Sequence, residues 1–595
     1  MLLSDYVVEF LVGKHIRDIF LVSGGGIMYL LDSVGRNPNI RYYCNYHEQA
    51  CAVAAEGYAR VRNDVGACLV TTGPGAANAV SALPAAWVDS VPLMVICGNV
   101  KQELIADHTK IRQIGPQETN VIGMARPVTK YAKSIRDPNT IRFELEYAYS
   151  EATSDRPGPV LLEIPLDVQG AQVNPEQLPG YQPDRPKVAI NSLAAEVTEV
   201  IRTLKLAKRP ILVCGNGIHR AKGQELLRSL LDSLRVPVAL PVTAKDILEE
   251  DHPMNIGIFG TAGQRRANFA IQNSDCLLAI GAGLNVVKIG FNVHGFAPKA
   301  RKIIVDIDEA QLKHQVVHPD HAVQADAALF LREMAVQLSC SPYAAPGKWL
   351  DACAKWKAHY PLIVEDYHSD PAHVNSYVFW DKLADVIDAT DVIVTGNALD
   401  TTSYFQAYRV KRGQRTMNSG WGSMGWCLPL AIGASIGSGM RRTLCVTGDG
   451  SFQFNSQELL TIAHYRLPVK IFIFNNKGYS NIRGTQESFF QGRYVGADRG
   501  SGVGNPDYRL LAAAYGLGYS FIPTNAELES GIHAALAAEG PAMIEVNLSA
   551  QQRIFPKGSA RRLPDGKFES PPLEDMAPFL PRDEFWKNMR QFDDD

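Results

Sequence analysis

Apolar segments rich in β-branched residues alternate with helix-forming segments along almost the whole chain. In the first third, the apolar segments are "IFLVSGGG", "ACLVTTGPG", "LMVICGN" and "PVLLEIP", and each leads into a turn built on glycine or proline. Helix-forming sequence such as "HEQACAVAAEGYARV" separates them. This alternation predicts a parallel sheet with helices on both of its faces.

The same pattern occurs in two further blocks. A polar, proline-bearing linker, "NPEQLPGYQPDRPK", precedes the strands "PILVCGNG", "CLLAIGAG" and "KIIVDID". After "LSCSPYAAPGK", the third block contains "DVIVTG", "TLCVTGDG", "VKIFIFNN" and "AMIEVNL". We therefore predict an α/β fold of three consecutive doubly wound parallel-sheet domains, at 1–172, 188–338 and 365–548, with a C-terminal extension at 549–595. Ligands of such sheets bind beyond the carboxyl ends of the strands.

Composition excludes several classes of function. A net charge of −3 without a basic patch argues against a nucleic-acid partner. Ten cysteines without a Cys-x-x-Cys pair argue against a disulfide framework and a thiolate zinc site. Asp5 and Glu9 interrupt the N-terminus where a signal peptide needs an apolar core, and no apolar run reaches membrane-spanning length. We expect a cytoplasmic protein without a membrane partner.

Two apolar runs in "CVTGDGSFQFNSQELLTIAHYRLPVKIFIFNN" end on small oxygen-bearing residues, Gly448–Gly450 and Asn475–Asn476. A carboxylate from Asp449 with an amide oxygen is a ligand set for Mg²⁺ or Ca²⁺. The small residues let backbone N–H groups approach a phosphate, and a helix after Ser451 would present its N-terminus to it. A simple Asp-capped turn explains Gly-Asp-Gly alone. The second strand end, roughly 25 residues further on, favours the metal site.

This pairing at this spacing resembles the thiamine diphosphate motif. From Tyr6 to about Leu548, the chain resembles the thiamine-diphosphate-dependent 2-keto acid decarboxylase and acetolactate synthase superfamily, with its order of pyrimidine-binding, central and diphosphate-binding domains. The resemblance implies thiamine diphosphate and Mg²⁺ as cofactors. It also implies Asp449 and Asn476 as metal ligands, with the Gly478 carbonyl as a third.

In "NYHEQACAVAAEGYAR", Glu48 stands at the start of an alanine-rich, buried helix, where a glutamate is commonly only a capping partner. The resemblance instead makes Glu48 the catalytic glutamate that hydrogen-bonds the aminopyrimidine ring and so activates the cofactor. Burial would keep its carboxyl protonated or sharing a proton. Glu56, in the same motif, is interpreted as structural.

Further cofactor contacts follow from the same resemblance. Met424 in "SGWGSMGWCLP" matches the apolar wedge that bends the cofactor, and "VTGNALDTT" stands where the family contacts the diphosphate. The residues assigned to cofactor binding are Glu48, Pro74, Asn78, Asp400, Thr401, Gly422, Met424, Gly448, Asp449, Gly450, Ser451 and Asn476. Since the family joins its first and third domains across a subunit interface, the resemblance also implies a homodimer or homotetramer.

Acetolactate synthase is the nearest subfamily, as "RPGPVLLEIPLDV", "GPGAANAVSAL", "SMGWCLPLAIGAS" and "VDIDEAQLKH" indicate. Gln117-Glu118 and Lys130 match its active-site Gln-Glu pair and a lysine of its substrate channel. The substrate-pocket residues assigned here are Gly25, Gln117, Asn397 and Thr485.

The acceptor side departs from that subfamily at three places. Val287 replaces an arginine that grips the carboxylate of the second keto acid, which removes a bidentate clamp. Thr485 replaces a tryptophan, and Thr261–Gly263 replaces a Met-His-Gly run near the flavin. These changes weaken the case for FAD, although Gly215–Gly217 and Gly281–Gly283 leave room for an adenine nucleotide as an alternative.

The C-terminal extension looks similar to tails of relatives that transfer an acetyl unit to keto sugars. Arg553, Lys557, Arg561 and Arg562 would face an anionic acceptor, or they belong to a solvated arm that wraps a neighbouring subunit, which is the favoured interpretation. We predict an enzyme that decarboxylates a 2-keto acid, pyruvate first, and transfers the acyl unit to a carbonyl acceptor. The alternatives are genuine acetolactate synthase, acetyl transfer to a nucleotide keto sugar, a simple decarboxylase and a non-catalytic homologue.

Overall fold

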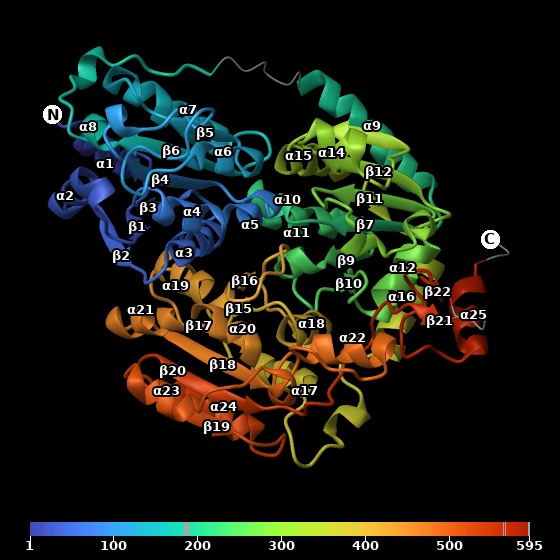
Figure 1. Ribbon diagram of the computed structural model, residues 1–595. Helices are drawn as coiled ribbons and strands as arrows, with labels where there is room; N and C mark the ends of the chain where they lie inside the picture. The colour runs from blue at the N-terminus through green and yellow to red at the C-terminus, as the bar shows by residue number, and fades with distance from the viewer. Residues whose placement is uncertain (184–189, 563–564, 566, 593–595) are drawn as a thin grey trace.

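Three six-stranded sheets, each with all strands parallel, form the centres of three α/β units in the computed structural model, which describes residues 1–183, 190–562, 565 and 567–592 (Figure 1). The first sheet has the order β2-β1-β3-β4-β6-β5. Its strands are β1 (Asp18–Leu21), β2 (Arg41–Cys44), β3 (Gly66–Val70), β4 (Leu93–Asn99), β5 (Tyr131–Ser134) and β6 (Pro159–Pro165). The end of the predicted linker and the predicted start of the second domain, at 184–189, lie outside the described residues.

The other two sheets have the orders β10-β9-β7-β11-β12-β13 and β16-β15-β17-β18-β20-β19. The second contains β7 (Pro210–Cys214), β9 (Val238–Pro241), β10 (Asn255–Phe259), β11 (Cys276–Ile280), β12 (Arg301–Asp306) and β13 (His321–Gln324). The third contains β15 (Val392–Thr395), β16 (Thr416–Met417), β17 (Thr443–Gly448), β18 (Val469–Asn475), β19 (Gly518–Ile522) and β20 (Ala542–Asn547). This arrangement confirms the predicted fold class.

Every apolar run that the sequence analysis singled out is a strand. The strands that it did not single out include all six edge strands: β2, β5, β10, β13, β16 and β19. Edge strands are covered by fewer neighbours, and β2 and β19 are largely exposed or half-exposed, so they need no continuous apolar run. In the described residues, no helix is long and apolar enough to cross a membrane.

The first and third units are joined by two helices whose backbones touch. Helix α3 (Glu48–Arg62) packs on α19 (Cys427–Gly437), and a Cβ at Gly57 or Gly433 would overlap a carbonyl of the other helix. Beside this contact, the Arg60 guanidinium donates to Glu56 at 3.0 Å and to the Asn418 carbonyl at 2.7 Å. Glu56 thus lies in a buried network that spans the two units, in line with a structural role.

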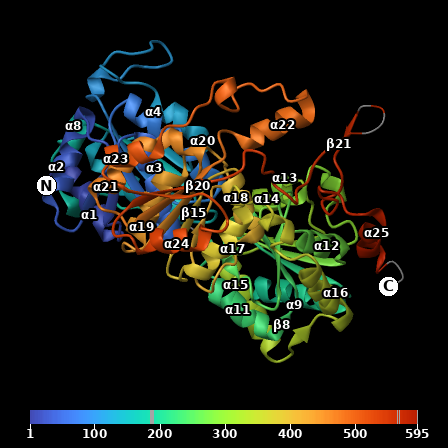
Figure 2. The same ribbon diagram turned by 90° about the horizontal axis from the view of Figure 1, so that it is seen from below.

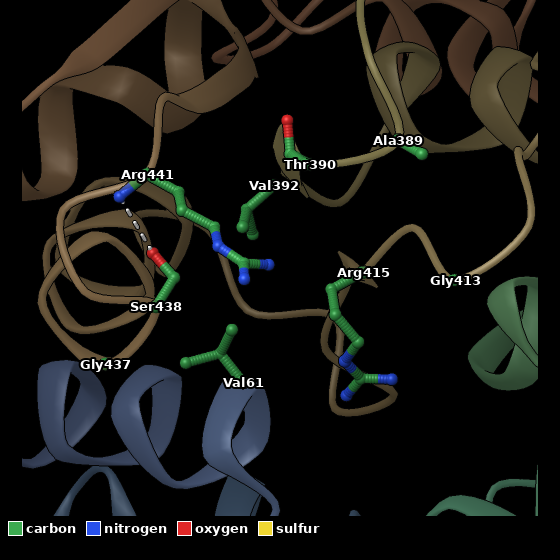
Figure 3. A pocket seen from close by; sticks show the side chains of 9 residues that line it. All are labelled: Val61, Ala389, Thr390, Val392, Gly413, Arg415, Gly437, Ser438 and Arg441. Carbon is green, nitrogen blue, oxygen red and sulfur yellow. Dashed lines mark hydrogen bonds between the residues drawn. The ribbon is translucent and has the colours of Figure 1, made fainter.

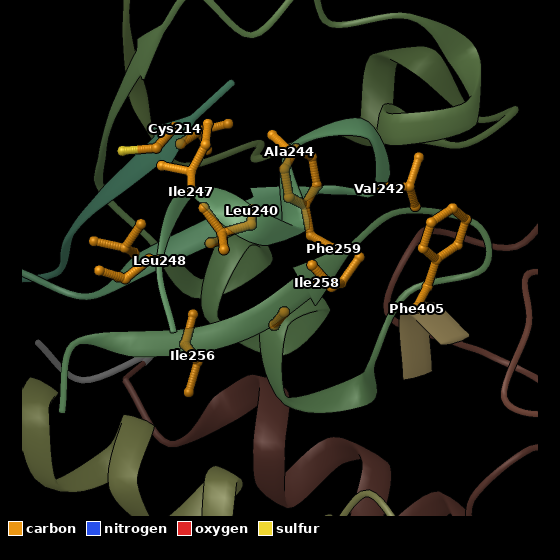
Figure 4. Packing of buried hydrophobic residues seen from close by; sticks show 14 of the residues in the cluster. Cys214, Leu240, Val242, Ala244, Ile247, Leu248, Ile256, Ile258, Phe259 and Phe405 are labelled. Carbon is orange, nitrogen blue, oxygen red and sulfur yellow. The ribbon is translucent and has the colours of Figure 1, made fainter. Parts of the chain in front are cut away.

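The central and third units share an apolar core. Phe405 of α18 (Leu399–Ala407) is buried in the same cluster as Val242 and Phe259 of the central unit, and Figure 4 shows these side chains beside one another. Ring and methyl groups from both units exclude water there, which fixes α18 against the central sheet.

The end of the C-terminal extension is docked on its own chain rather than solvated, which corrects that part of the expectation, whereas a contact with a neighbouring subunit stays a prediction. Its α25 (Arg582–Arg590) packs on the central unit against α12 (Arg265–Asn273), as Figures 1 and 2 show. Apolar side chains spaced along a polar stretch make the contact, and Leu573, Met576, Phe585 and Phe592 are buried. The side chains of Arg561 and Arg562 lie outside what the structure describes.

Candidate functional site

Asp449 and Asn476 lie at the same edge of the third sheet. β17 and β18 are parallel neighbours with Gly448 opposite Phe474, so Asp449 and Asn476 follow adjacent strand ends. Asp449 opens the short helix α20 (Asp449–Phe452), so the helix begins before Ser451 and not after it as the sequence predicted. Both side chains are buried, with 1% and 4% exposure.

The Asp449 carboxylate accepts three hydrogen bonds from nearby N–H groups. Its Oδ2 accepts from the Gly478 backbone N–H at 2.9 Å and from the Asn505 amide at 2.7 Å, and its Oδ1 accepts from the Gly450 N–H at 2.8 Å. Burial raises the pKa of Asp449, while these hydrogen bonds lower it. Sequence reasoning missed Asn505; its only signal was a polar residue in the turn before α23 (Tyr508–Ala514).

Two amide oxygens beside this carboxylate are buried and unsatisfied. Asn476 Oδ1 and Asn505 Oδ1 have no hydrogen-bond partner in the part of the chain that the structure describes. A buried acceptor without a partner costs free energy that a cation would recover. A carboxylate, amide oxygens and the backbone at Gly478 match the hard-oxygen preference of Mg²⁺, so the residues present fit the metal. No group of three His, Cys, Asp or Glu side chains in the described residues offers an alternative metal site.

The loop after Asn476 is fixed by Arg483 of α22 (Ser480–Phe490). This buried guanidinium donates to the main-chain oxygens of Asn476 at 2.8 Å and Lys477 at 3.2 Å. It also donates to those of Ala497 and Ala550. The loop that carries the predicted metal ligands is therefore held from α22.

On the predicted diphosphate side, small residues admit close contacts. A Cβ at Gly450 would overlap the Tyr479 ring, so only glycine fits there. The Ser451 hydroxyl accepts a hydrogen bond from the Gly425 N–H at 3.0 Å, which joins this helix start to the loop that carries Met424.

Asp400 and Thr401 use their side chains within their own loop. The Asp400 carboxylate accepts from the N–H groups of Gly396 at 2.6 Å and Ala398 at 3.1 Å, and burial raises the pKa of Asp400 to about 6. The Thr401 hydroxyl is bonded to the Thr395 hydroxyl at 2.5 Å. Their predicted contact with a diphosphate stays a prediction, and it would have to compete with these bonds.

Asn397 and Gly422 contact each other beyond the carboxyl end of β15 in the third sheet. The Asn397 amide donates to the Gly422 carbonyl at 3.0 Å, and Gly422 adopts a positive φ of 70° that suits glycine. Gly422 is one of the residues that the family resemblance assigns to cofactor binding. Met424, two residues on, is half-buried.

The first unit gathers a second group of predicted residues. Glu48 is the first residue of α3 and is only half-buried, and its Oε2 accepts from the Asn78 amide at 2.9 Å. Pro74 opens α4 (Pro74–Val80), and the Gln117 carbonyl lies against Gly73 just before it. Gly25 is flanked by glycines that lie against Thr71 and Thr72.

The two groups are not joined directly in the single chain. Among the described residues, no hydrogen bond or ion pair links Glu48 to Asp449 or Asn476. The segment before Glu48 is nonetheless anchored to the third unit, because Glu458 accepts from the Asn45 amide at 2.7 Å and from the Tyr46 N–H at 2.9 Å.

The residues assigned to the substrate side differ in their exposure and in their contacts. Thr485 is exposed on α22 and donates to the Asn481 carbonyl. Glu118 is buried and its Oε2 lies 3.1 Å from His108 Nε2, while the Lys130 ammonium donates to the Ser154 carbonyl at 2.7 Å. A separate pocket of about 190 Å³, between α3, β15 and α19, is lined by none of the predicted site residues (Figure 3).

Comparison with known families matches all three units. Residues 1–122, 197–334 and 397–546 match, in that order, the thiamine pyrophosphate enzyme N-terminal TPP binding domain, central domain and C-terminal TPP binding domain. The order is the one that the resemblance predicted.

Individual relatives match over nearly the full length. The acetolactate synthase large subunit of Parasynechococcus marenigrum (strain WH8102) is 34% identical over 90% of this chain and 86% of its own. That of Cyanidium caldarium is 30% identical over 92% and 94%, and isozyme 1 of Escherichia coli (strain K12) is 29% identical over 93% and 95%. These matches confirm the resemblance to the acetolactate synthases.

Proposed function

Because the chain belongs to the thiamine pyrophosphate enzyme family, we propose that it decarboxylates a 2-keto acid, pyruvate first, and transfers the acyl unit to a carbonyl acceptor. The observation that carries this proposal is the buried edge at Asp449 and Asn476, with its unsatisfied amide oxygens. The donor loses CO₂, its acyl carbon bonds to the acceptor carbonyl carbon, and the acceptor oxygen takes a proton. Thiamine diphosphate, when bound, supplies the nucleophilic carbon and the electron sink.

The residues of the third unit would hold Mg²⁺ and, through it, the diphosphate. Asp449, Asn476 and the Gly478 carbonyl are the proposed ligands, as the family resemblance implies. The amide of Asn505 fixes the orientation of the Asp449 carboxylate through its 2.7 Å hydrogen bond. Arg483 holds the backbone of Asn476 in place.

Glu48 would exchange a proton with the aminopyrimidine ring. The Asn78 amide donates to one carboxylate oxygen and leaves the other for the ring. In the single chain this carboxyl is only half-buried, whereas its proposed role needs a water-poor site. A second copy of the chain that covers Glu48 would meet that need, which supports a homo-oligomer; analytical ultracentrifugation tests it.

The acceptor separates this proposal from its main rival. The names of the relatives favour acetolactate synthase activity. Val287 and Thr485 favour another carbonyl acceptor, because a guanidinium and an indole of that subfamily are missing. Simple aldehyde release and a non-catalytic homologue are the remaining alternatives.

We propose that no flavin is needed. The loops that resemble a nucleotide site are bonded to each other, since the Gly217 N–H donates to the Gly281 carbonyl at 3.0 Å. Thr261, near the predicted flavin end, is covered by the C-terminal extension through a hydrogen bond from the Gly558 N–H. The test is to denature the purified protein by heat and to measure flavin fluorescence in the supernatant, which should be absent.

One experiment tests the proposed function. With thiamine diphosphate, Mg²⁺ and pyruvate alone, the purified protein should release about one CO₂ per active site, because the acyl unit leaves only when it is transferred to an acceptor. Addition of an aldehyde acceptor should make CO₂ release continuous, with little acetolactate formed. Acetolactate equal to the CO₂ released would establish the rival, free acetaldehyde would establish a decarboxylase, and the absence of CO₂ would refute the proposal.

A further inference from the structure

The C-terminal extension contacts the places at which the chain departs from the acetolactate synthase pattern. The Gly558 N–H donates to the Thr261 carbonyl at 2.6 Å, and the Thr261 N–H donates to the Val287 carbonyl at 2.9 Å. Gly558 is the last residue of what we call the tail segment, residues 553–558. The tail segment thus reaches the loops that carry two of the three departures.

The first residue of the tail segment reaches the third departure. Arg553 forms an ion pair with Glu487 on α22, two residues from Thr485. Between the two ends, the Gln406 amide donates to the carbonyls of Pro556, Ala262 and Gly263. The tail segment therefore bridges α22 and the central unit.

Lys557 lies between these anchors and has no counter-charge. Its backbone is held by two hydrogen bonds with Ala577, at 2.9 and 2.8 Å. Its side chain is half-buried, and in the described part of the chain no hydrogen bond or ion pair engages its ammonium. Burial and the nearby Arg553 guanidinium lower the pKa of Lys557. A half-buried cation beside another cation is costly unless an anion joins them.

We propose that Lys557 binds a phosphate group carried by the carbonyl acceptor, in place of the arginine that acetolactate synthases carry at position 287, while Arg553 stays paired with Glu487. A guanidinium clamps a carboxylate or a phosphate in a bidentate geometry, whereas an ammonium binds phosphate as a compact point charge that needs no fixed fork. Valine at 287 and threonine at 485 are also smaller than arginine and tryptophan, which is compatible with an acceptor larger than a simple keto acid. This inference rests on the proposed function and names the acceptor class for it.

A structural role for Lys557 is the competing explanation. Its aliphatic stem could simply cover apolar surface while its ammonium meets water. Such a role would affect stability and all acceptors alike, whereas a phosphate contact affects only phosphorylated acceptors.

The test uses the full-length protein with thiamine diphosphate, Mg²⁺ and pyruvate, and compares glyceraldehyde 3-phosphate with glyceraldehyde as acceptors. These two probes differ only in the phosphate. The native protein should show a KM for the phosphate ester at least about tenfold lower than for the neutral aldehyde. Lys557→Gln should abolish that ratio, and Lys557→Arg should restore most of it.

Lys587→Gln is the matched control, because Lys587 is an exposed lysine of the same extension, on α25. It should keep the native ratio of KM values. The inference is overturned if the native protein shows similar KM values for the two probes or uses neither of them as an acceptor. It is also overturned if Lys557→Gln keeps the native ratio of KM values. CO₂ release from pyruvate is measured in parallel: its absence refutes the proposed function, whereas normal release with an unchanged ratio refutes only the role of Lys557.

Discussion

The guanidinium of Arg483 donates to the main-chain oxygen of Asn476 at 2.8 Å, so a helix on the predicted acceptor side holds a predicted metal ligand in place. No carboxylate in the described residues pairs with this buried arginine, and four backbone carbonyls satisfy it instead. The backbone position of the loop that carries Asn476, and the positive charge beside it, therefore both depend on the Arg483 side chain.

Arg483→Lys should weaken Mg²⁺ binding by about tenfold or more, because an ammonium cannot reach four carbonyls that a planar guanidinium reaches. The measurement is the Mg²⁺ concentration that half-maximally raises Tm in the presence of thiamine diphosphate. Arg499→Lys, at an exposed arginine nearby, should change nothing. An unchanged Mg²⁺ midpoint in Arg483→Lys would show that the loop holds its shape alone.

Asn505→Ala should reduce Mg²⁺ affinity about 10- to 100-fold while leaving the fold intact. The variant removes the 2.7 Å hydrogen bond that orients Asp449 and an unsatisfied oxygen beside the site. Calorimetric titration of Mg²⁺ into the protein with thiamine diphosphate measures the effect. Native affinity in the variant would exclude Asn505 from the site.

Glu48→Gln should lower CO₂ release from pyruvate by about 10²- to 10⁴-fold, because the amide cannot exchange a proton with the cofactor. Since Glu48 is half-buried and bonded only to Asn78 among the described side chains, Tm should stay close to that of the native protein. An active Glu48→Gln enzyme would contradict the proposed proton transfer.

The raised pKa of Asp400 should make the free energy of unfolding fall as pH rises between about 4 and 6. Its folded pKa of about 6 lies above the ordinary value of 3.8 for an aspartate, so the folded state binds more protons across this window. The contribution is complete below the unfolded pKa and is lost as pH rises through the folded one. Asp400→Asn should flatten the change of Tm across this pH range relative to the native protein; parallel curves for the two proteins would argue against the shift.

Phe585→Ala should destabilise the protein by about 3 kcal/mol, because the ring is 4% exposed and packs near Phe269 of the central unit. Trp586→Ala is the control, since its neighbouring ring is 45% exposed. Thermal unfolding compares the two. Equal losses of Tm would mean that α25 is not docked in solution as the structure has it.

The sequence allowed the metal edge to be predicted because its information is local. The runs that became β17 and β18 are mostly apolar and almost fully buried, and each leads directly to an oxygen-bearing residue. Adjacent parallel strands then bring Asp449 and Asn476 together without further assumptions.

Other features depend on tertiary contacts that no local pattern encodes. Asn505 lies 56 residues from Asp449 and reaches it only through the loop before α23. The docking of the extension uses apolar residues such as Met576 scattered in a polar stretch, which has neither helical nor strand periodicity. Asp400 resembled a diphosphate contact, and only the structure shows how fully its own turn occupies it.

The close approach of α3 and α19 limits how this molecule can open. With Gly57 and Gly433 set against opposing carbonyls, the first and third units of one chain cannot slide past each other without breaking a dry backbone contact. Glu48 and the loop that carries Met424 consequently belong to one rigid frame within the chain. Helix α22 and the tail segment lie outside this contact, so sequence variation there can alter the proposed acceptor side without disturbing the frame.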